Sequence, residues 1–175
     1  MTDNLRYPIG GPKLSARLDD AARREAIDAI AATPANLRAA VQGLTEEQLD
    51  TPYRPEGWTV RQLVHHVPDS HLNAYVRFKL ALTEEEPKIK TYAEARWAEL
   101  PDTHTTPPEV SLALLESLHH RWVDLLRAMA PADFERKLDH PEKGLLTLDS
   151  MLGLYAWHGC HHVAHVTKLR ERMGW

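Results

Sequence analysis

Four segments of about 20 residues, each with apolar side chains at helical intervals, constrain the fold of this chain more than any other feature. Apolar residues that recur every three or four positions form a stripe along one side of a helix, and such stripes pack against one another. The sequence contains no convincing run of alternating residues that would indicate a sheet. We therefore predict an all-α four-helix bundle. Its expected helices span residues 21–41, 59–82, 108–129 and 148–172.

Proline and capping signals mark the ends and connections of these segments. Pro34 follows Thr33, which predicts either two helical pieces or one kinked helix in the first segment. Residues 45–48, Thr-Glu-Glu-Gln, have the pattern of a capping box and predict a short extra turn. Because the connections are long, the helices need not alternate simply up and down. The connections are expected to hold a short helix at 92–99, a loop that includes Pro101, and a hairpin within 130–146.

Composition and charge limit the classes of partner. A chain of 175 residues is long enough to bury a core, and we expect one domain over residues 1–175. A net charge of −4 gives no electrostatic reason to expect nucleic-acid binding. No stretch is apolar enough for a membrane span or a secretory signal, so we expect no membrane partner and a cytoplasmic location. The single cysteine, Cys160, excludes an internal disulfide and a zinc site of several cysteines.

Eleven histidines are many for this length, and four of them lie between residues 158 and 165. They form two H-x-x-x-H pairs, and histidines four residues apart on a helix can bind one metal ion. At 100° per residue, His158 and His162 face the apolar stripe of the last segment. His165 lies near the edge of that stripe, and His161 faces away from it. We therefore assign the core-facing pair to a metal site.

A third ligand is expected on the second segment, because two ligands do not hold a metal ion well. His66 lies beside the apolar stripe that includes Leu63 and Phe78, whereas His65 points away from it, toward solvent or a loop. His71 lies on the far edge of the stripe, which favours a structural role. Three neutral imidazoles leave an open position for water or substrate, as in catalytic sites. This ligand set suits zinc, nickel, iron or cobalt.

These histidines lie in two longer motifs that resemble those of a known family. Residues 53–66, YRPEGWTVRQLVHH, are similar to the first metal motif of the DinB/YfiT-like superfamily, in which the ligand histidine follows a tryptophan by eight positions. Residues 155–165, YAWHGCHHVAH, resemble its second metal motif. The resemblance is to the YfiT branch in particular, continues through residues 69–85 and 111–119, and extends over essentially the whole chain.

The resemblance implies a four-helix bundle with up-down-down-up topology that forms a homodimer. It also implies one divalent metal ion per subunit, with His66, His158 and His162 as ligands, the three that the helical angles favour. We expect zinc or nickel at this site. Members of the family are described as metal-dependent hydrolases, and some relatives transfer low-molecular-weight thiols such as bacillithiol or mycothiol.

Two reactions and one non-enzymatic role are compatible with these ligands. The first is metal-assisted hydrolysis of a small molecule, for which the sequence offers no obvious general base; His165 and Asp69, together with His161, are the candidates nearest to the ligands. The second is thiol transfer, in which the metal activates the thiol and no protein base is needed. In the third, the metal only holds the bundle together.

Arg77, Cys160 and two tryptophans also have alternative roles. Arg77 lies three turns after His66 on the same side of the helix and could bind a substrate carboxylate, although a surface or helix-end ion pair is the commoner role. Cys160 points away from the expected ligands, and we interpret it as a packing residue. Trp122 and Trp157 are interpreted as core or dimer-interface residues.

Overall fold

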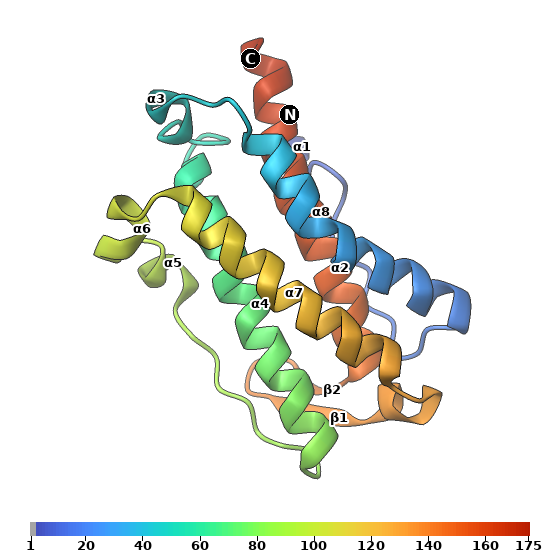
Figure 1. Cartoon of the computed structure of the whole chain (residues 1–175). Helices are drawn as coiled ribbons and strands as arrows, with labels where there is room; N and C mark the ends of the chain where they lie inside the picture. The colour runs from blue at the N-terminus through green and yellow to red at the C-terminus, as the bar shows by residue number, and fades with distance from the viewer. Residues whose placement is uncertain (1–2) are drawn as a thin grey trace.

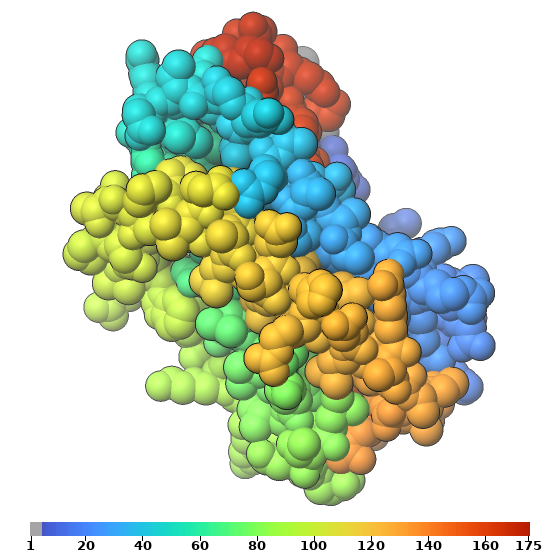
Figure 2. Space-filling model, viewed as in Figure 1, coloured from blue at the N-terminus to red at the C-terminus, as the bar shows by residue number. Residues whose placement is uncertain are grey.

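Four long helices form most of the computed structural model, which describes residues 3–175 (Figure 1). α2 (Asp20–Val41) and α8 (Leu148–Met173) run in one direction, and α4 (Val60–Thr83) and α7 (Pro108–Ala128) run in the other. α2 and α4 each pack against both α7 and α8. Figure 2 shows α2 and α7 in contact across one face of the bundle. The predicted all-α four-helix bundle with up-down-down-up topology is confirmed.

Short elements occupy the connections. The predicted short helix and hairpin are found as α5 (Glu94–Trp97) and the antiparallel strands β1 (Lys137–His140) and β2 (Gly144–Thr147). The loop predicted around Pro101 is wrong: Pro101 begins α6 (Pro101–Thr105), because the first turn of a helix does not need the N–H that proline lacks. None of the helices in residues 3–175 has the length and apolarity that a membrane crossing needs. The remaining elements are α1 (Asp3–Arg6), α3 (Glu46–Leu49) and the 3-10 helix η1 (Pro131–Glu135).

Side-chain caps set where α3 and α4 begin. Gln62 N–H donates to Thr59 Oγ1 (3.1 Å), and Thr59 N–H donates to Gln62 Oε1 (3.0 Å), so the first turn of α4 is closed by a capping box. Thr45 and Gln48 form the predicted box before α3. An N-cap of this kind contributes about 1 kcal/mol. The box at Thr59 thereby fixes the start of the helix that carries His66.

Pro34 lies inside α2, which is nevertheless one continuous helix rather than two pieces. A proline nitrogen carries no hydrogen, so the carbonyl oxygen four residues earlier, that of Ile30, receives no helical hydrogen bond from Pro34. Ile30 is fully buried, and its carbonyl oxygen instead lies 2.7 Å from Nδ1 of His119 on α7. Pro34 therefore leaves a buried acceptor free for a side chain of a neighbouring helix.

The buried side chains form two apolar clusters with a polar layer between them. Each long helix passes from one cluster to the other; α2, for example, contributes Ile30 to the first and Leu37 to the second. Between these two levels, the buried residues of the other helices include several histidines. The polar layer is therefore bounded on both sides by side chains that exclude water. Its histidines include the buried His66, His71, His119 and His162 and the partly buried His158.

Candidate metal centre

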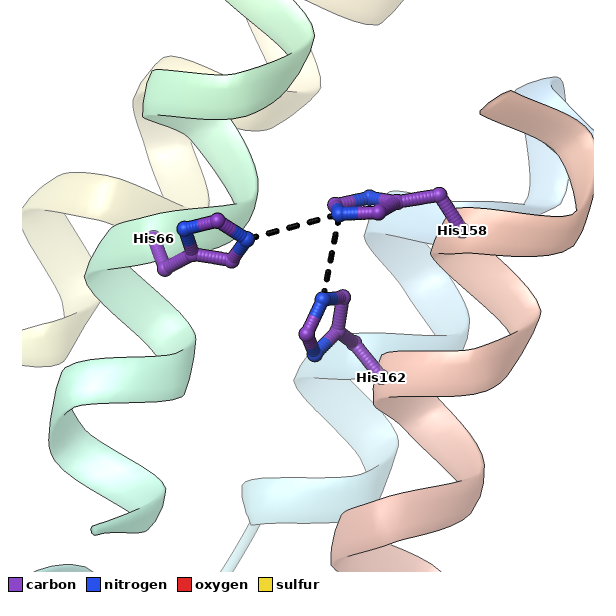
Figure 3. Close-up of side chains that lie close together, drawn as sticks. All are labelled: His66, His158 and His162. Carbon is purple, nitrogen blue, oxygen red and sulfur yellow. Dashed lines mark hydrogen bonds between the residues drawn. The ribbon is translucent and has the colours of Figure 1, made fainter. Parts of the chain in front are cut away.

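Three histidines from two helices meet in the polar layer (Figure 3). His66 comes from α4, and His158 and His162 come from successive turns of α8. The Nε2 atom of His158 lies 3.4 Å from that of His66 and 3.1 Å from that of His162. One ring nitrogen from each residue lies within 4.8 Å of the other two, so the group could hold a metal ion. The structure thus brings together the three residues that the sequence predicts.

The spacing of these nitrogens fits a divalent metal ion. Zinc–nitrogen bonds of about 2.0–2.1 Å at tetrahedral angles place two ligand nitrogens about 3.3 Å apart. The two separations at His158 Nε2, 3.1 and 3.4 Å, lie on either side of that value. Three rings supply three ligands and leave the remaining coordination position to water or substrate.

Burial keeps the three rings uncharged at neutral pH. It lowers the pKa of His66 from 6.5 to about 4. Burial, together with neighbouring histidines, lowers the pKa of His158 and of His162 well below 6.5. The neutral imidazole is the form that binds a metal, because its unprotonated nitrogen offers a lone pair. A metal ion therefore does not compete with a second ring proton at these histidines near pH 7.

A cavity of about 390 Å³ opens over the histidines, and several of its walls are aromatic. Trp58 packs on His66 with ring centroids 4.5 Å apart. The N-terminal segment covers another side, where Trp157 Nε1 donates to the Gly10 carbonyl oxygen (2.9 Å) and Tyr7 lies against the Trp157 ring. Trp157 therefore lines the cavity, whereas Trp122 is fully buried in the core, as predicted. The cavity has room for a small molecule beside the open ligand position.

The second histidine pair of α8 lines the same cavity. The Nε2 atoms of His161 and His165 lie 3.0 Å apart, and the His165 ring packs on Tyr53 with centroids 4.1 Å apart. His161, which is expected to face away from the apolar stripe, is buried against Trp157. Burial lowers the pKa of His165 to about 3 and that of His161 to about 4. Among the described residues, this pair belongs to no group of three possible ligands.

Two further histidines continue from His158: His71 contacts it, and His119 contacts His71. His158 Nδ1 lies 3.1 Å from Nε2 of His71, and His71 Nδ1 lies 2.8 Å from Nε2 of His119. His119 Nδ1 in turn reaches the Ile30 carbonyl oxygen. The sequence assigns His71 a structural role and gives no role to His119. Helical angles reveal the face of one helix, and this chain of contacts joins four helices, α8, α4, α7 and α2.

His65 and Cys160 each differ in one respect from what the sequence predicts. His65 is buried rather than solvent-exposed, and its Nδ1 lies 2.7 Å from Oγ of Ser111 on α7. Cys160 is exposed, which corrects its interpretation as a packing residue. Asp69 is half-buried on α4, and burial with the nearby Asp102 raises its pKa to about 6. Asp69 lines neither the cavity over the metal ligands nor the one next to it.

Arg77 lines that second cavity, which has a volume of about 470 Å³ and shares His158 and Glu94 with the first. The Arg77 side chain is buried, with 8% exposure. It donates to the Lys90 carbonyl oxygen (3.0 Å) and reaches the Tyr155 hydroxyl at 3.5 Å. No carboxylate in residues 3–175 forms an ion pair with it, so the ion-pair alternative for Arg77 is not found in the part of the chain that the structure describes. A buried cation thus faces the second cavity.

Comparison with known proteins identifies the family. The model of the DinB superfamily matches residues 29–166. This chain belongs to the DinB superfamily. Two similar proteins carry the name "Putative metal-dependent hydrolase": one from Bacillus mycoides is 53% identical over 172 residues, which cover 98% of this chain and 99% of the relative. The other, YfiT of Bacillus subtilis, is 51% identical over 173 residues, which cover 98% and 97%.

A solved structure supports the same DinB relationship. It is described as YfiT from Bacillus subtilis, "a probable metal-dependent hydrolase with an unusual four-helix bundle topology". It matches this chain with a TM-score of 0.95 at 51% identity and covers 98% of this chain and 99% of that one. The resemblance on which the sequence motifs rest is confirmed, and so is the helical architecture.

Proposed function

We propose that this DinB protein is a hydrolase of small molecules that depends on one divalent metal ion, held by His66, His158 and His162. The observation that carries the proposal is the convergence of three uncharged imidazoles beneath a cavity. The names of its relatives support it. A cavity over the ligands argues against a metal that only holds the bundle together. Imidazole ligands suit zinc or nickel, which we propose as the metal.

A bound divalent metal would supply Lewis acidity, which polarises a substrate carbonyl and lowers the pKa of water. The protein's own residues supply the remaining functions. The aromatic walls at Trp58 and Tyr53 exclude solvent and pack on apolar parts of a substrate. We propose His165 as the residue that accepts a proton during the reaction, because it lines the cavity and its low pKa leaves the ring unprotonated at neutral pH. Asp69 ranks second, since it lies outside the cavity.

Thiol transfer is the second candidate, and one observation favours it. In residues 3–175, the rings of the three proposed ligands hydrogen bond only to other histidines, with no carboxylate among their partners. The carboxylates that line the cavity, those of Glu56 and Glu94, belong to exposed residues. A metal-activated thiol is already deprotonated and needs no protein base. The homodimer that the family resemblance implies stays a prediction.

The experiment that divides the two reactions uses the zinc-loaded or nickel-loaded protein with a panel of esters, amides and alkyl halides, with and without low-molecular-weight thiols. Hydrolysis products formed without thiol support the hydrolase. Products that appear only with thiol, and that contain its sulfur, support the transferase instead. His162→Ala serves as the inactive control, because it removes a proposed ligand. Equal turnover by wild type and His162→Ala would contradict both reactions at this site.

We further propose that the substrate carries an anionic group, such as a carboxylate, which Arg77 binds in the second cavity. A buried guanidinium without a carboxylate partner is costly unless a ligand compensates its charge. Its planar N–H groups match a carboxylate in geometry. Because His158 and Glu94 line both cavities, one molecule can reach from Arg77 to the metal ligands. Lys143, Glu94 and Glu142 also line this cavity, but they are exposed to solvent, so Arg77 is its buried charge.

Binding of acetate, followed by NMR of the arginine side chains, tests the role of Arg77. Saturable shifts of the Arg77 resonances are expected with acetate and not with acetamide. Arg77→Met should abolish the binding. Arg61→Met is the matched control, because Arg61 is equally buried but already paired with Asp50 and Glu46. Absence of saturable binding to wild type, or its loss in Arg61→Met as well, would rule out the anion site.

A further inference from the structure

We infer that His119 and His71 form a relay that fixes the tautomer of His158, so that the lone pair of its Nε2 atom faces the other two proposed ligands. The inference rests on the proposed metal site, which it deepens. His71 and His119 are positioning residues, because they act through His158. Neither of them lines the cavity over the ligands. Both are almost fully buried, with exposures of 0% and 2%.

The direction of each hydrogen bond follows from the last acceptor. A carbonyl oxygen can only accept, so Nδ1 of His119 must carry the proton that points to Ile30. A neutral imidazole has one N–H, and Nε2 of His119 is therefore an acceptor.

The same argument then passes along the relay. His71 must donate from Nδ1 to His119, which makes Nε2 of His71 an acceptor. His158 must donate from Nδ1 to His71. Its Nε2 atom is left with a lone pair, 3.4 Å from His66 Nε2 and 3.1 Å from His162 Nε2.

The opposite set of tautomers conflicts with the carbonyl oxygen. With a proton on Nε2 of each ring, the lone pair of His119 Nδ1 would face the lone pairs of the Ile30 oxygen at 2.7 Å. The proton of His158 would then occupy the nitrogen that is needed for the metal. A doubly protonated ring would avoid the conflict, but it would place an unpaired charge among buried side chains. One neutral arrangement therefore satisfies every contact.

Pro34 explains why the Ile30 carbonyl oxygen is free to be the last acceptor of the relay. In an ordinary helix, the N–H of residue 34 would donate to the Ile30 carbonyl oxygen. Proline has no such N–H, and the free oxygen accepts from His119 instead. A carbonyl oxygen cannot pass a proton onward, so the relay ends inside the protein. Its contacts suit orientation of a ligand rather than proton transport.

Nitrogen-15 NMR of the histidine rings in the metal-free protein tests the tautomers directly. His119, His71 and His158 are expected to carry their protons on Nδ1. His119→Leu removes the acceptor for His71 and should return His158 to a mixture of tautomers. Zinc affinity, measured by competition with a chromophoric chelator, should then fall about 10- to 100-fold, the usual effect of losing a partner that orients a metal ligand.

Two variants separate the relay from simple destabilisation. His119→Gln should restore most of the affinity, because a carboxamide can donate to Ile30 through its nitrogen and accept from His71 through its oxygen. His65→Leu removes another buried histidine bonded to α7, and it should lower stability without changing the His158 tautomer.

The outcomes distinguish the relay from the metal site. A wild-type His158 protonated on Nε2 would overturn the relay, as would equal zinc loss in His65→Leu and His119→Leu, or no zinc loss in His119→Leu. If His119→Leu does not fold, the His158 tautomer in the wild-type spectrum and the zinc affinity of His119→Gln still test the relay. Wild type that shows the Nδ1 tautomers but binds no zinc would instead overturn the proposed metal centre.

Discussion

The two histidine pairs of α8 have the same spacing and nearly the same geometry, yet they face different surroundings. The Nε2 atoms lie 3.1 Å apart in the 158/162 pair and 3.0 Å apart in the 161/165 pair, and all four rings are buried or nearly so. The first pair meets a third imidazole, His66, whereas the second packs on aromatic rings. Spacing on one helix therefore creates a pair of donors, and tertiary packing decides whether the pair becomes a metal centre.

Replacing one histidine of each pair gives the largest expected difference. His162→Ala leaves two of the three proposed ligands and should weaken zinc binding by more than about 100-fold, since loss of a partner outside the ligand set alone costs up to that much. His165→Ala should retain about one zinc ion per chain. Metal analysis of the two purified variants measures the difference. Full zinc retention by His162→Ala would show that His162 is not a ligand.

The choice between the pairs could be predicted from sequence because it depends on one helix. The apolar stripe of α8 includes His158 and His162, and the stripe of α4 runs beside His66, so the angles identify all three. The long helices and the capping box at Thr45 likewise follow from local patterns.

Contacts between elements could not be predicted in this way. His161 is buried because Tyr7 and Trp157 cover it, and His65 because it meets Ser111 of α7. The relay behind His158 needs the crossing of α2, α4 and α7 at one level. Each of these residues looks like an edge or surface position when its own helix is considered alone.

Lowering the pH tests a property that the metal-site histidines share with the 161/165 pair, the burial of uncharged rings. The folded-state pKa of His66 is about 4 and those of His161 and His165 are about 4 and 3, whereas each titrates near 6.5 in the unfolded chain. The unfolded state thus takes up protons first as pH falls. Stability is complete above about pH 6.5 and decreases as the pH approaches 4. The shift at His66 alone corresponds to a loss on the order of 3 kcal/mol.

Urea unfolding of the metal-free protein between pH 7.5 and pH 4 measures this loss. His66→Gln should show a smaller decrease than wild type, because one buried titrating group is gone. His120→Gln is the control, since His120 is exposed on α7, and its profile should match wild type. A wild-type stability that stays constant down to pH 4.5 would contradict the burial of neutral histidines.

Gly159 tests how closely α2 must approach the 158/162 pair. A Cβ atom at this position would collide with the side chain of Thr33 on α2, next to His158. Gly159→Ala should therefore destabilise the protein by about 1–3 kcal/mol, the usual cost of overpacking, and should weaken zinc binding. Gly153→Ala on the same helix has open space and should instead stabilise by up to about 1 kcal/mol. Thermal unfolding of both variants measures whether each substitution stabilises or destabilises the protein. Equal changes in stability would show that residue 159 has room for a Cβ atom beside α2.

Pro34 provides the smallest and most specific test, because the relay serves only the 158/162 pair. Pro34→Ala restores an N–H at residue 34, which competes with His119 for the Ile30 carbonyl oxygen. Since a carbonyl oxygen can accept two hydrogen bonds, the contact should weaken rather than break. Pro34→Ala should therefore lower zinc affinity by at most about two- to tenfold, which is the energy of one hydrogen bond. The ring nitrogens of His161 and His165, which do not touch the relay, should keep their NMR shifts. A change at His161 and His165 equal to that at His158 would mean that Pro34 shapes the whole helix and not the relay.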